Sequence, residues 1–233
     1  MDKLFSSLVI ADTHDDLLRN IVSLRVSEDL FDDLSDDAAE RQAAQNIELE
    51  CKPPVFESNV PIIHRPFEEA TWNEAIGYPF RNWMYSRYSD GTFGVWYGAD
   101  RVETTVFETV HHWRRQLLDD AGFNKPGVQM ERKVYKVRCD AALLDLRGSV
   151  GAYPGLVHPS DYTLTHQVGA RMYREGHPGL VVTSARCEGE CYAILNKTVL
   201  SNPRQVCFLT YITKENGVVV ERTPGTTWMT IPQ

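Results

Sequence analysis

The sequence lacks any long hydrophobic run. Its longest uninterrupted apolar stretches are only a few residues, such as Leu8 to Ala11 and Gly179 to Val182. A membrane-spanning helix needs about 20 consecutive apolar residues, so the sequence predicts no such helix and no membrane association. The first five residues contain no cationic stretch followed by a long apolar core. We therefore expect no secretion signal and a cytoplasmic location.

Basic residues are scarce relative to acidic ones. The chain has 24 Lys and Arg against 32 Asp and Glu, a formal net charge of −8. The excess is concentrated in residues 1–50, which hold 13 acidic and 4 basic side chains. Nucleic-acid phosphates are bound by clustered Lys and Arg. An acidic chain without a basic stripe therefore predicts no direct nucleic-acid binding.

Cysteine is also sparse and irregularly placed. The five cysteines are Cys51, Cys139, Cys187, Cys191 and Cys207. An odd number at irregular spacing favours free thiols over a disulfide framework. Cys187 and Cys191 could form half of a zinc site, but no second pair follows at ligand spacing, so we predict no metal.

The common catalytic motifs are missing as well. The sequence has no phosphate loop, no Gly-x-Gly-x-x-Gly, no Gly-x-Ser-x-Gly and no His-Glu-x-x-His. His111 and His112 are adjacent, so on a helix they point about 100° apart and cannot share a metal ion. A cysteine–histidine nucleophile pair stays open, since no spacing selects one.

The chain of 233 residues is long enough to fold without disulfides, because this length buries roughly 70% of the surface of the unfolded chain. Residues 15–50 are predicted to be helical, starting with a helix whose apolar positions are Leu17, Leu18, Ile21, Val22 and Leu24. Pro53-Pro54 is the one plausible internal boundary. We therefore predict an acidic helical N-terminal extension over residues 1–55, packed on a main domain over residues 56–233.

The main domain mixes strands and helices without regular βαβ alternation, which indicates the α+β class. Helices are predicted from residue 100 to about 119 and from 161 to 174, with Gly176 ending the second. Residues 66–92 read as irregular. Asn216-Gly217 predicts a tight turn between the last two strands. The predicted strands are 60–64, 93–99, 134–146, 179–185, 190–196, 205–213 and 217–221.

The most informative stretch runs from Ser86 to Thr109. Arg87 precedes a predicted strand, Tyr97 lies near the end of that strand, and Glu108 lies two turns into the next helix. This order can bring a cation, an aromatic ring and a carboxylate to one cleft. Composition alone favours a solvated helix face around Glu108 and a core aromatic at Tyr97.

This stretch resembles the RES-domain family, the toxins of many bacterial toxin–antitoxin pairs. His64-Arg65-Pro66 is similar to the family's early arginine at a strand end, and Gly179 to Arg186 is similar to its late strand ending in a serine, here Ser184. The resemblance covers roughly residues 62–196. Two departures stand out: Tyr85-Ser86 precede the second arginine where many members have glycines, and the N-terminal segment is longer than in compact members.

The resemblance implies an ADP-ribosyltransferase-like mixed sheet core with flanking helices. It also implies an enzyme that depletes NAD by cleaving the bond between nicotinamide and ribose, with phosphate, water or a protein as the acceptor. NAD is then the substrate, inorganic phosphate a candidate co-substrate, and no resident cofactor is expected. The expected partner is a cognate antitoxin of the helix-turn-helix, Xre-like type, and the choice between a monomer and a homo-oligomer stays open.

The resemblance also implies roles for individual residues. Glu108 would stabilise positive charge that develops on the ribose, and Arg65 and Arg87 would hold the pyrophosphate. Tyr97 would stack on or orient the nicotinamide ring, and Ser184 would hydrogen-bond ribose or phosphate. Arg65, Arg87 and Ser184 each have a structural alternative, in which Arg65 pairs with Glu68 or Glu69, Arg87 braces the loop at Asp90 and Ser184 satisfies backbone groups at a strand end. A catalytically silent partner-binding module is the competing class of function.

Overall fold

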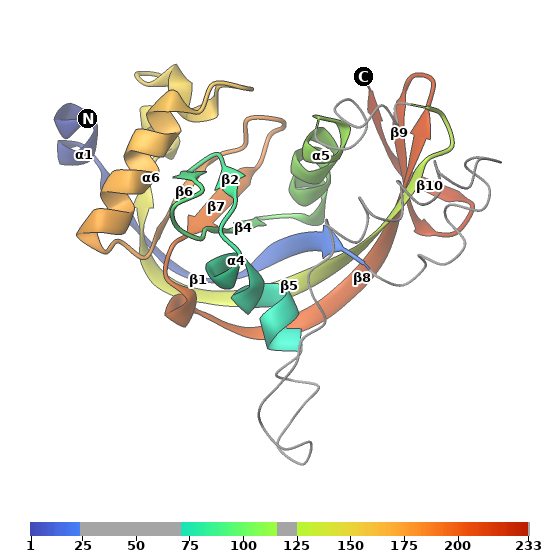
Figure 1. Cartoon of the computed structure of the whole chain (residues 1–233), viewed down its shortest axis with the longest axis horizontal. Coiled ribbons are helices and arrows are strands. Elements are labelled where there is room, and N and C mark those ends of the chain that lie inside the picture. The colour runs from blue at the N-terminus through green and yellow to red at the C-terminus, as the bar shows by residue number, and fades with distance from the viewer. Residues whose placement is uncertain (24–70, 116–124, 233) are drawn as a thin grey trace, which may run out of the picture. The chain divides into compact units, whose positions relative to one another are not determined.

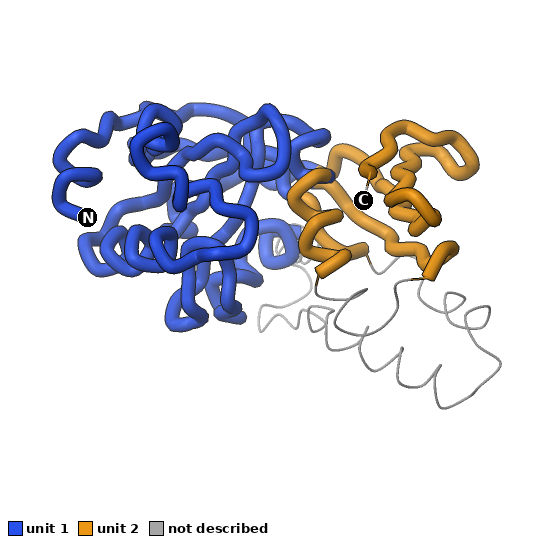
Figure 2. Tube along the Cα trace, turned by 90° about the horizontal axis from the view of Figure 1, so that it is seen from above, with its two compact units in different colours: residues 1–19, 58–106, 135–204 blue, residues 20–57, 107–134, 205–233 orange. Residues whose placement is uncertain are grey.

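The computed structural model describes residues 1–23, 71–115 and 125–232. The chain divides into two compact units, coloured separately in Figure 2. Unit 1 comprises Met1–Arg19, Ser58–Val106 and Tyr135–Arg204, and unit 2 comprises Asn20–Glu57, Phe107–Val134 and Gln205–Gln233. The predicted boundary near residue 55 lies outside the described residues, so the predicted domain limits stay a prediction.

Unit 1 contains a mixed sheet. Its strands lie in the order β1, β4, β7, β6, β5 (Figure 1). All neighbours are antiparallel except β5 and β6, which run parallel with Leu144 opposite Leu180. The mixed sheet with helices confirms the predicted α+β class. The strand bounds are Val9–Val22 for β1, Trp96–Ala99 for β4, Gln129–Asp145 for β5, Gly179–Thr183 for β6 and Glu190–Ile194 for β7.

Helix α6 (Thr163–Glu175) covers one face of this sheet. Its Val168 and Met172 are buried in one core cluster with Leu180, Val182 and Ala193 of β6 and β7. The predicted helix from 161 to 174 is confirmed. Asp161 accepts the amide N–H of Thr163 at 2.9 Å, and Gly176 ends the helix with a left-handed φ of 76°.

The predicted helix over residues 15–24 is wrong. A short helix, α1 (Asp2–Ser6), is followed by the long strand β1, in which Leu17 and Leu18 are both buried. Consecutive apolar residues on a strand buried on both faces cannot be distinguished from one helix face by periodicity. The acidic residues pair across strands instead of favouring a helix N-terminus, as when Asp16 binds Arg204 at 2.5 Å. The predicted helices over residues 24–50 lie outside the described residues.

The segment before β4 is more regular than predicted. A π-helical turn η1 (Asn73–Gly77) and helix α4 (Tyr78–Arg81) precede a small hairpin of β2 (Tyr85–Ser86) and β3 (Ser89–Asp90). The fully buried Trp96 of β4 donates its indole N–H to the carbonyl of Ala75 at 2.8 Å, which anchors this segment to the sheet. The strand predicted at 60–64 lies outside the described residues.

Helix α5 (Val102–Trp113) begins close to its predicted start and has residues in both units. The segment between β5 and α6 contains the short 3-10 helices η3 (Arg147–Ser149) and η4 (Pro154–Val157). No helix of the described ranges is long and apolar enough to cross a membrane.

Unit 2 contains the part of β8 (Leu200–Lys214) from Gln205 onward, together with β9 (Gly217–Thr223) and β10 (Thr226–Pro232), and the three strands pair in that order. The 3-10 helix η5 (Lys197–Val199) lies between β7 and β8 in the chain. Lys214 pairs with Gly217, so the predicted hairpin is confirmed with its turn one residue earlier than expected. Strand β10 was not predicted, although a left-handed Gly225 precedes its run of β-formers.

A buried polar network supports α5 within unit 2. Arg132, only 8% exposed, donates its Nε–H to Asn20 Oδ1 at 2.9 Å. The amide of Asn20 donates to the hydroxyl of Tyr211 at 2.9 Å, and that hydroxyl lies 2.8 Å from the hydroxyl of Thr109. Buried polar groups satisfied in this way hold their elements in one arrangement. The network therefore fixes the helix position next to Glu108.

Candidate active site

Arg87 lies at the tip of the β2–β3 hairpin, in the two-residue turn that it forms with Tyr88. The hairpin is held by Tyr97 of β4. The Tyr97 hydroxyl donates to Ser86 Oγ at 2.9 Å and accepts the amide N–H of Tyr88 at 3.0 Å. One phenol thus binds the residues on both sides of Arg87, which fixes the backbone that carries the guanidinium.

Helix α6 holds the same turn from another direction. His166 Nε2 lies 2.8 Å from the carbonyl oxygen of Ser86, and because a carbonyl only accepts, Nε2 is the donor. Gly169 brings the helix backbone against the hairpin, since a Cβ at this position would lie 1.8 Å from the carbonyl oxygen of Tyr88. The absence of a side chain at Gly169 is therefore a packing requirement.

The guanidinium of Arg87 has two contacts. Its Nη1 donates to the carbonyl of His158 at 2.9 Å, and its Cζ lies 4.7 Å from the ring centre of Tyr162. The alternative in which Arg87 braces the loop at Asp90 is not supported by the contacts of Asp90, which accepts from the amide and hydroxyl of Thr92. The charge of Arg87 is therefore oriented by a neutral main-chain oxygen.

Ser184 organises the loop that follows β6. Its hydroxyl, in a side chain only 7% exposed, accepts the amide N–H of Arg186 at 3.0 Å and the thiol of Cys187 at 3.6 Å. This turn directs Arg186, whose Nη2 donates to the carbonyl of Pro159 at 2.5 Å. Arg87 and Arg186 therefore bind the carbonyls of two consecutive residues, and their guanidinium groups converge on one segment.

The Tyr97 phenol is neutral at physiological pH. Burial raises the pKa of Tyr97 to about 12, and the hydrogen bond from its hydroxyl to Ser86 opposes that rise. A phenol with this pKa does not serve as a base near neutral pH, so its chemical contribution is to donate and accept hydrogen bonds.

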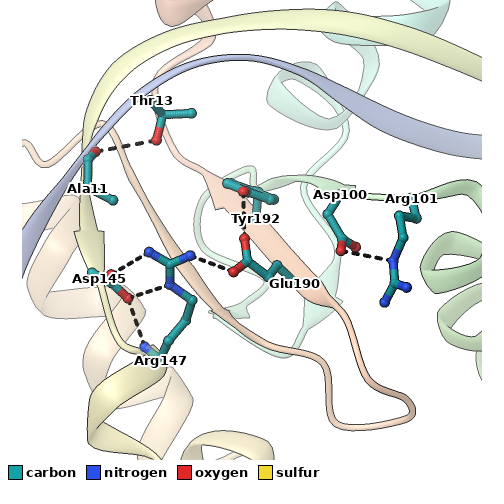
Figure 3. Close-up of polar contacts among 8 residues, drawn as sticks. All are labelled: Ala11, Thr13, Asp100, Arg101, Asp145, Arg147, Glu190 and Tyr192. Carbon is teal, nitrogen blue, oxygen red and sulfur yellow. Dashed lines mark hydrogen bonds and ion pairs between the residues drawn. The ribbon is translucent and has the colours of Figure 1, made fainter.

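A second polar cluster joins the ends of β5 and β7 (Figure 3). Arg147 donates to both carboxylate oxygens of Asp145, at 2.9 and 2.6 Å, and to Glu190 at 2.5 Å. Tyr192 donates to the other oxygen of Glu190 at 2.9 Å. The arginine holds the pKa of the Asp145 carboxyl below its ordinary value. Since Glu190 begins β7, the cluster fixes one end of the loop that contains Ser184.

The same loop approaches the first turn of α5. A Cβ on Gly189 would lie 2.2 Å from the hydroxyl of Thr104, which in turn donates to Asp100 at 2.7 Å. Arg101 donates to the carbonyl of Glu188. The start of α5 and the loop after β6 are thus packed together without room for a larger residue at position 189.

Three of the five predicted site residues, Arg87, Tyr97 and Ser184, lie in unit 1. Tyr97 connects to Arg87 through Ser86, and Ser184 connects to it through Arg186 and the His158-Pro159 segment. Glu108 lies on α5 in unit 2, and Arg65 lies outside the described residues. The chemical roles assigned to all five stay predictions.

Sequence reasoning missed His166, Gly169 and Tyr162. Gly169 had a usable signal, because a glycine inside a predicted helix costs about 1 kcal/mol relative to alanine and indicates a close approach. His166 and Tyr162 had none, since their partners lie about 80 residues away in the sequence. The contact of Arg186 with Pro159, next to the contact of Arg87 with His158, is a finding of the structure.

The described residues offer no ready metal site. No group of three or more His, Cys, Asp or Glu side chains in residues 1–23, 71–115 and 125–232 is arranged to hold a metal ion. No disulfide joins the four cysteines in these ranges, Cys139, Cys187, Cys191 and Cys207.

A comparison with known protein families matches the part of the chain that contains these residues. The family model described as the RES domain matches residues 61–214. The chain belongs to the RES-domain family. The match includes the Arg87 hairpin, Tyr97, Glu108 and the Ser184 loop. No curated protein matches the sequence. A chain of the crystal structure of the M.tuberculosis MbcT–MbcA toxin–antitoxin complex is similar, with a TM-score of 0.46 and 11% identity over 88% of this chain and 90% of that chain.

Proposed function

We propose that this RES-domain protein is the toxin of a toxin–antitoxin pair and that it depletes NAD. The proposed reaction breaks the bond between nicotinamide and ribose. The bonding pair leaves with the nicotinamide nitrogen, and an oxygen of phosphate or water bonds to the anomeric carbon of the ribose. The observation that carries the proposal is the convergence of Arg87 and Arg186 on consecutive carbonyls, within a chain that belongs to the RES-domain family.

Two adjacent guanidinium groups suit a pyrophosphate. A planar guanidinium makes two parallel hydrogen bonds to phosphate oxygens, and two of them can hold both phosphates of a dinucleotide. Each arginine donates an N–H to a main-chain carbonyl, and for Arg87 this neutral acceptor leaves the positive charge in place. Arg65 is proposed as a third cation on the strength of the family motif alone.

Glu108 is proposed to act on the developing charge. Cleavage of a bond to an anomeric carbon passes through an oxocarbenium-like transition state, positive at the ribose. A carboxylate directed at that carbon interacts more strongly as the charge grows, so it lowers the barrier and does not merely bind substrate. The family motif supports this role. The hydrogen bond between Thr109 and Tyr211 supports it further, because it fixes the helix beside Glu108.

Tyr97 is proposed to position the site and to orient the nicotinamide ring. Its hydroxyl holds the turn at Arg87, and only part of its side chain is accessible. Ser184 is proposed to contribute through its loop and to hydrogen-bond ribose or phosphate. A helix-turn-helix antitoxin is the proposed partner, and a homo-oligomer is the proposed assembly.

The test is NAD consumption by the purified full-length chain. We expect the wild-type chain to consume NAD, and Arg87→Ala and Glu108→Ala to lose at least about 100-fold in rate with unchanged circular dichroism spectra. Glu103→Gln, on the first turn of the same helix, is the matched control and should retain activity.

Three outcomes would contradict parts of the proposal. Wild-type rates in both alanine variants would remove the assigned residues. Radiolabel from NAD on a macromolecule would make the chain a protein ADP-ribosyltransferase. No NAD consumption, together with no growth arrest on expression, would favour the silent binding module.

A further inference from the structure

Three consecutive large apolar residues precede the Arg87 turn and are exposed. Trp83, Met84 and Tyr85 expose 55%, 63% and 62% of their surfaces. A single exposed aromatic residue is ordinary, whereas a run of three marks a contact surface. The run is therefore a candidate for binding a ligand or a partner.

Tyr85 differs from its two neighbours because other rings hold it. Its ring stacks on Tyr162 with a centroid distance of 6.2 Å and an interplanar angle of 25°, and it meets the ring of His166 edge to face at 4.8 Å. Its backbone belongs to β2 and pairs with Asp90. Tyr85 is thus held in place on one side while most of its surface stays accessible. A ring fixed in this way can receive another aromatic ring with little loss of side-chain entropy.

The charges beside Tyr85 indicate the kind of ligand. The guanidinium of Arg87 contacts the same Tyr162 ring on which Tyr85 stacks. Arg186 binds the carbonyl next to the one that Arg87 binds. An aromatic surface next to the Arg87 guanidinium, which donates only to a neutral carbonyl and packs on a neutral ring, is complementary to a flat base attached to a pyrophosphate.

We infer that Tyr85 is the base-stacking residue of this site and that it binds the adenine of an adenine dinucleotide whose pyrophosphate lies on Arg87 and Arg186. The inference rests on the proposed NAD chemistry for its occupant. Many family members have a glycine at this position. The inference gives Tyr85, which departs from that pattern, a part in substrate binding.

The position of Tyr85 selects the adenine end of the dinucleotide over the nicotinamide end. The bond that breaks must be shielded from bulk water, whereas the adenine takes no part in the reaction. Tyr85 is 62% exposed, while Ser184 is 7% exposed and burial of the Tyr97 phenol raises its pKa to about 12. The reacting end therefore fits the sheltered groups, and the remote base fits the exposed ring.

Isothermal titration calorimetry on the full chain with ADP and with inorganic pyrophosphate tests the inference. ADP carries the base and the pyrophosphate, and inorganic pyrophosphate carries only the anion. We expect Tyr85→Ala and Tyr85→Leu to weaken ADP binding about tenfold and to leave pyrophosphate binding unchanged. Tyr85→Phe keeps the ring and should stay within about twofold of the wild type. Trp83→Ala is the matched control, because Trp83 is similarly exposed but lies outside the ring cluster.

The outcomes separate this inference from the proposed function. ADP binding that is absent in the wild type, or unchanged in Tyr85→Ala, would overturn the base-stacking role, even for a chain that consumes NAD. Equal weakening of ADP and pyrophosphate binding would also overturn it, since the variant would then act by disturbing Arg87. Conversely, ADP binding that depends on the Tyr85 ring in a chain that does not consume NAD would support the base site and contradict only the proposed reaction.

Discussion

The hydroxyl of Tyr97 donates a hydrogen bond of 2.9 Å to the hydroxyl of Ser86, the residue immediately before Arg87. This bond joins the main sheet of unit 1 to the separate β2–β3 hairpin. An arginine at a turn would ordinarily sample many positions, because its backbone and its long side chain both lose entropy on ordering. Here the sheet itself restrains the turn, so Arg87 is positioned before any ligand binds.

Tyr97→Phe should therefore lower both stability and NAD turnover. The variant removes the donor to Ser86 and the acceptor of the Tyr88 N–H, and a lost hydrogen bond that leaves its partners unsatisfied costs about 1–3 kcal/mol. We expect urea unfolding to show a loss of this size and the kcat/KM for NAD to fall at least about tenfold, since small misplacements of a binding group are costly.

Tyr173→Phe provides the matched control for this variant. Tyr173 lies on α6 with 51% of its surface exposed, and its ring stacks on Phe93, a contact that phenylalanine preserves. It should keep wild-type stability and turnover. Full activity in Tyr97→Phe would contradict the positioning role.

Gly169→Ala should destabilise the protein in spite of the better helix propensity of alanine. The added Cβ would lie 1.8 Å from the carbonyl oxygen of Tyr88, which belongs to a restrained backbone and cannot move aside cheaply. We expect thermal or urea unfolding to show a loss of about 1–3 kcal/mol. Gly148→Ala, where no atom lies within 4 Å, should change the free energy of unfolding by less than about 0.5 kcal/mol. Equal effects of the two substitutions would contradict this account of α6 packing.

Asp145 should make stability depend on pH in acid. Hydrogen bonds from Arg147 hold the pKa of Asp145 below its ordinary value of 3.8 in the folded state. Its stabilising contribution is therefore complete above pH 3.8 and is lost as the pH falls through the lower folded-state pKa. Arg147→Met should reduce the free energy of unfolding at pH 7 by about 1 kcal/mol or less, because the pair is partly exposed. Urea unfolding at pH 7, 5, 4 and 3 should show this difference shrinking only below pH 3.8, and a constant difference would contradict the assignment.

The acceptor of the proposed reaction can be read from its product. We expect the rate of NAD loss to rise with inorganic phosphate and mass spectrometry to identify ADP-ribose 1″-phosphate. Arginine side chains that bind the substrate's phosphates can also bind inorganic phosphate, which supports this acceptor. Release of free ADP-ribose at a rate independent of phosphate would instead identify water as the acceptor.

Local sequence signals predicted the elements that depend on local chemistry. The Asp161 and Gly176 signals located α6 correctly, and Lys214 and Gly217 flank the hairpin turn that Asn216-Gly217 predicted. Caps and tight turns are decided by a few neighbouring residues, so a single sequence contains most of the information that determines them.

The elements that depend on distant partners were predicted less well. The sequence pattern predicts a helix where the structure has strand β1. Leu17 and Leu18 are buried on opposite faces of the sheet, and no local pattern distinguishes this arrangement from a helix face. The site showed the same division. The resemblance to the RES-domain family selects Arg87 and Tyr97, but the contacts from His166 and Arg186 arise only when segments about 80 and 27 residues apart in the chain come together.

Arg87 donates its hydrogen bond to the main-chain carbonyl of His158, and this has a consequence for tolerance to mutation. A carbonyl oxygen belongs to the main chain, so no exchange of the side chain at position 158 deletes it. His158 has an extended ψ of 135°, as the residue before a proline generally does, and its ring Nδ1 accepts the amide N–H of Asp161 at 2.8 Å, which braces the same turn. Substitutions at residue 158 should therefore keep the acceptor of Arg87 but lose the ring contact that braces its turn, and loss of Pro159 would release the backbone itself.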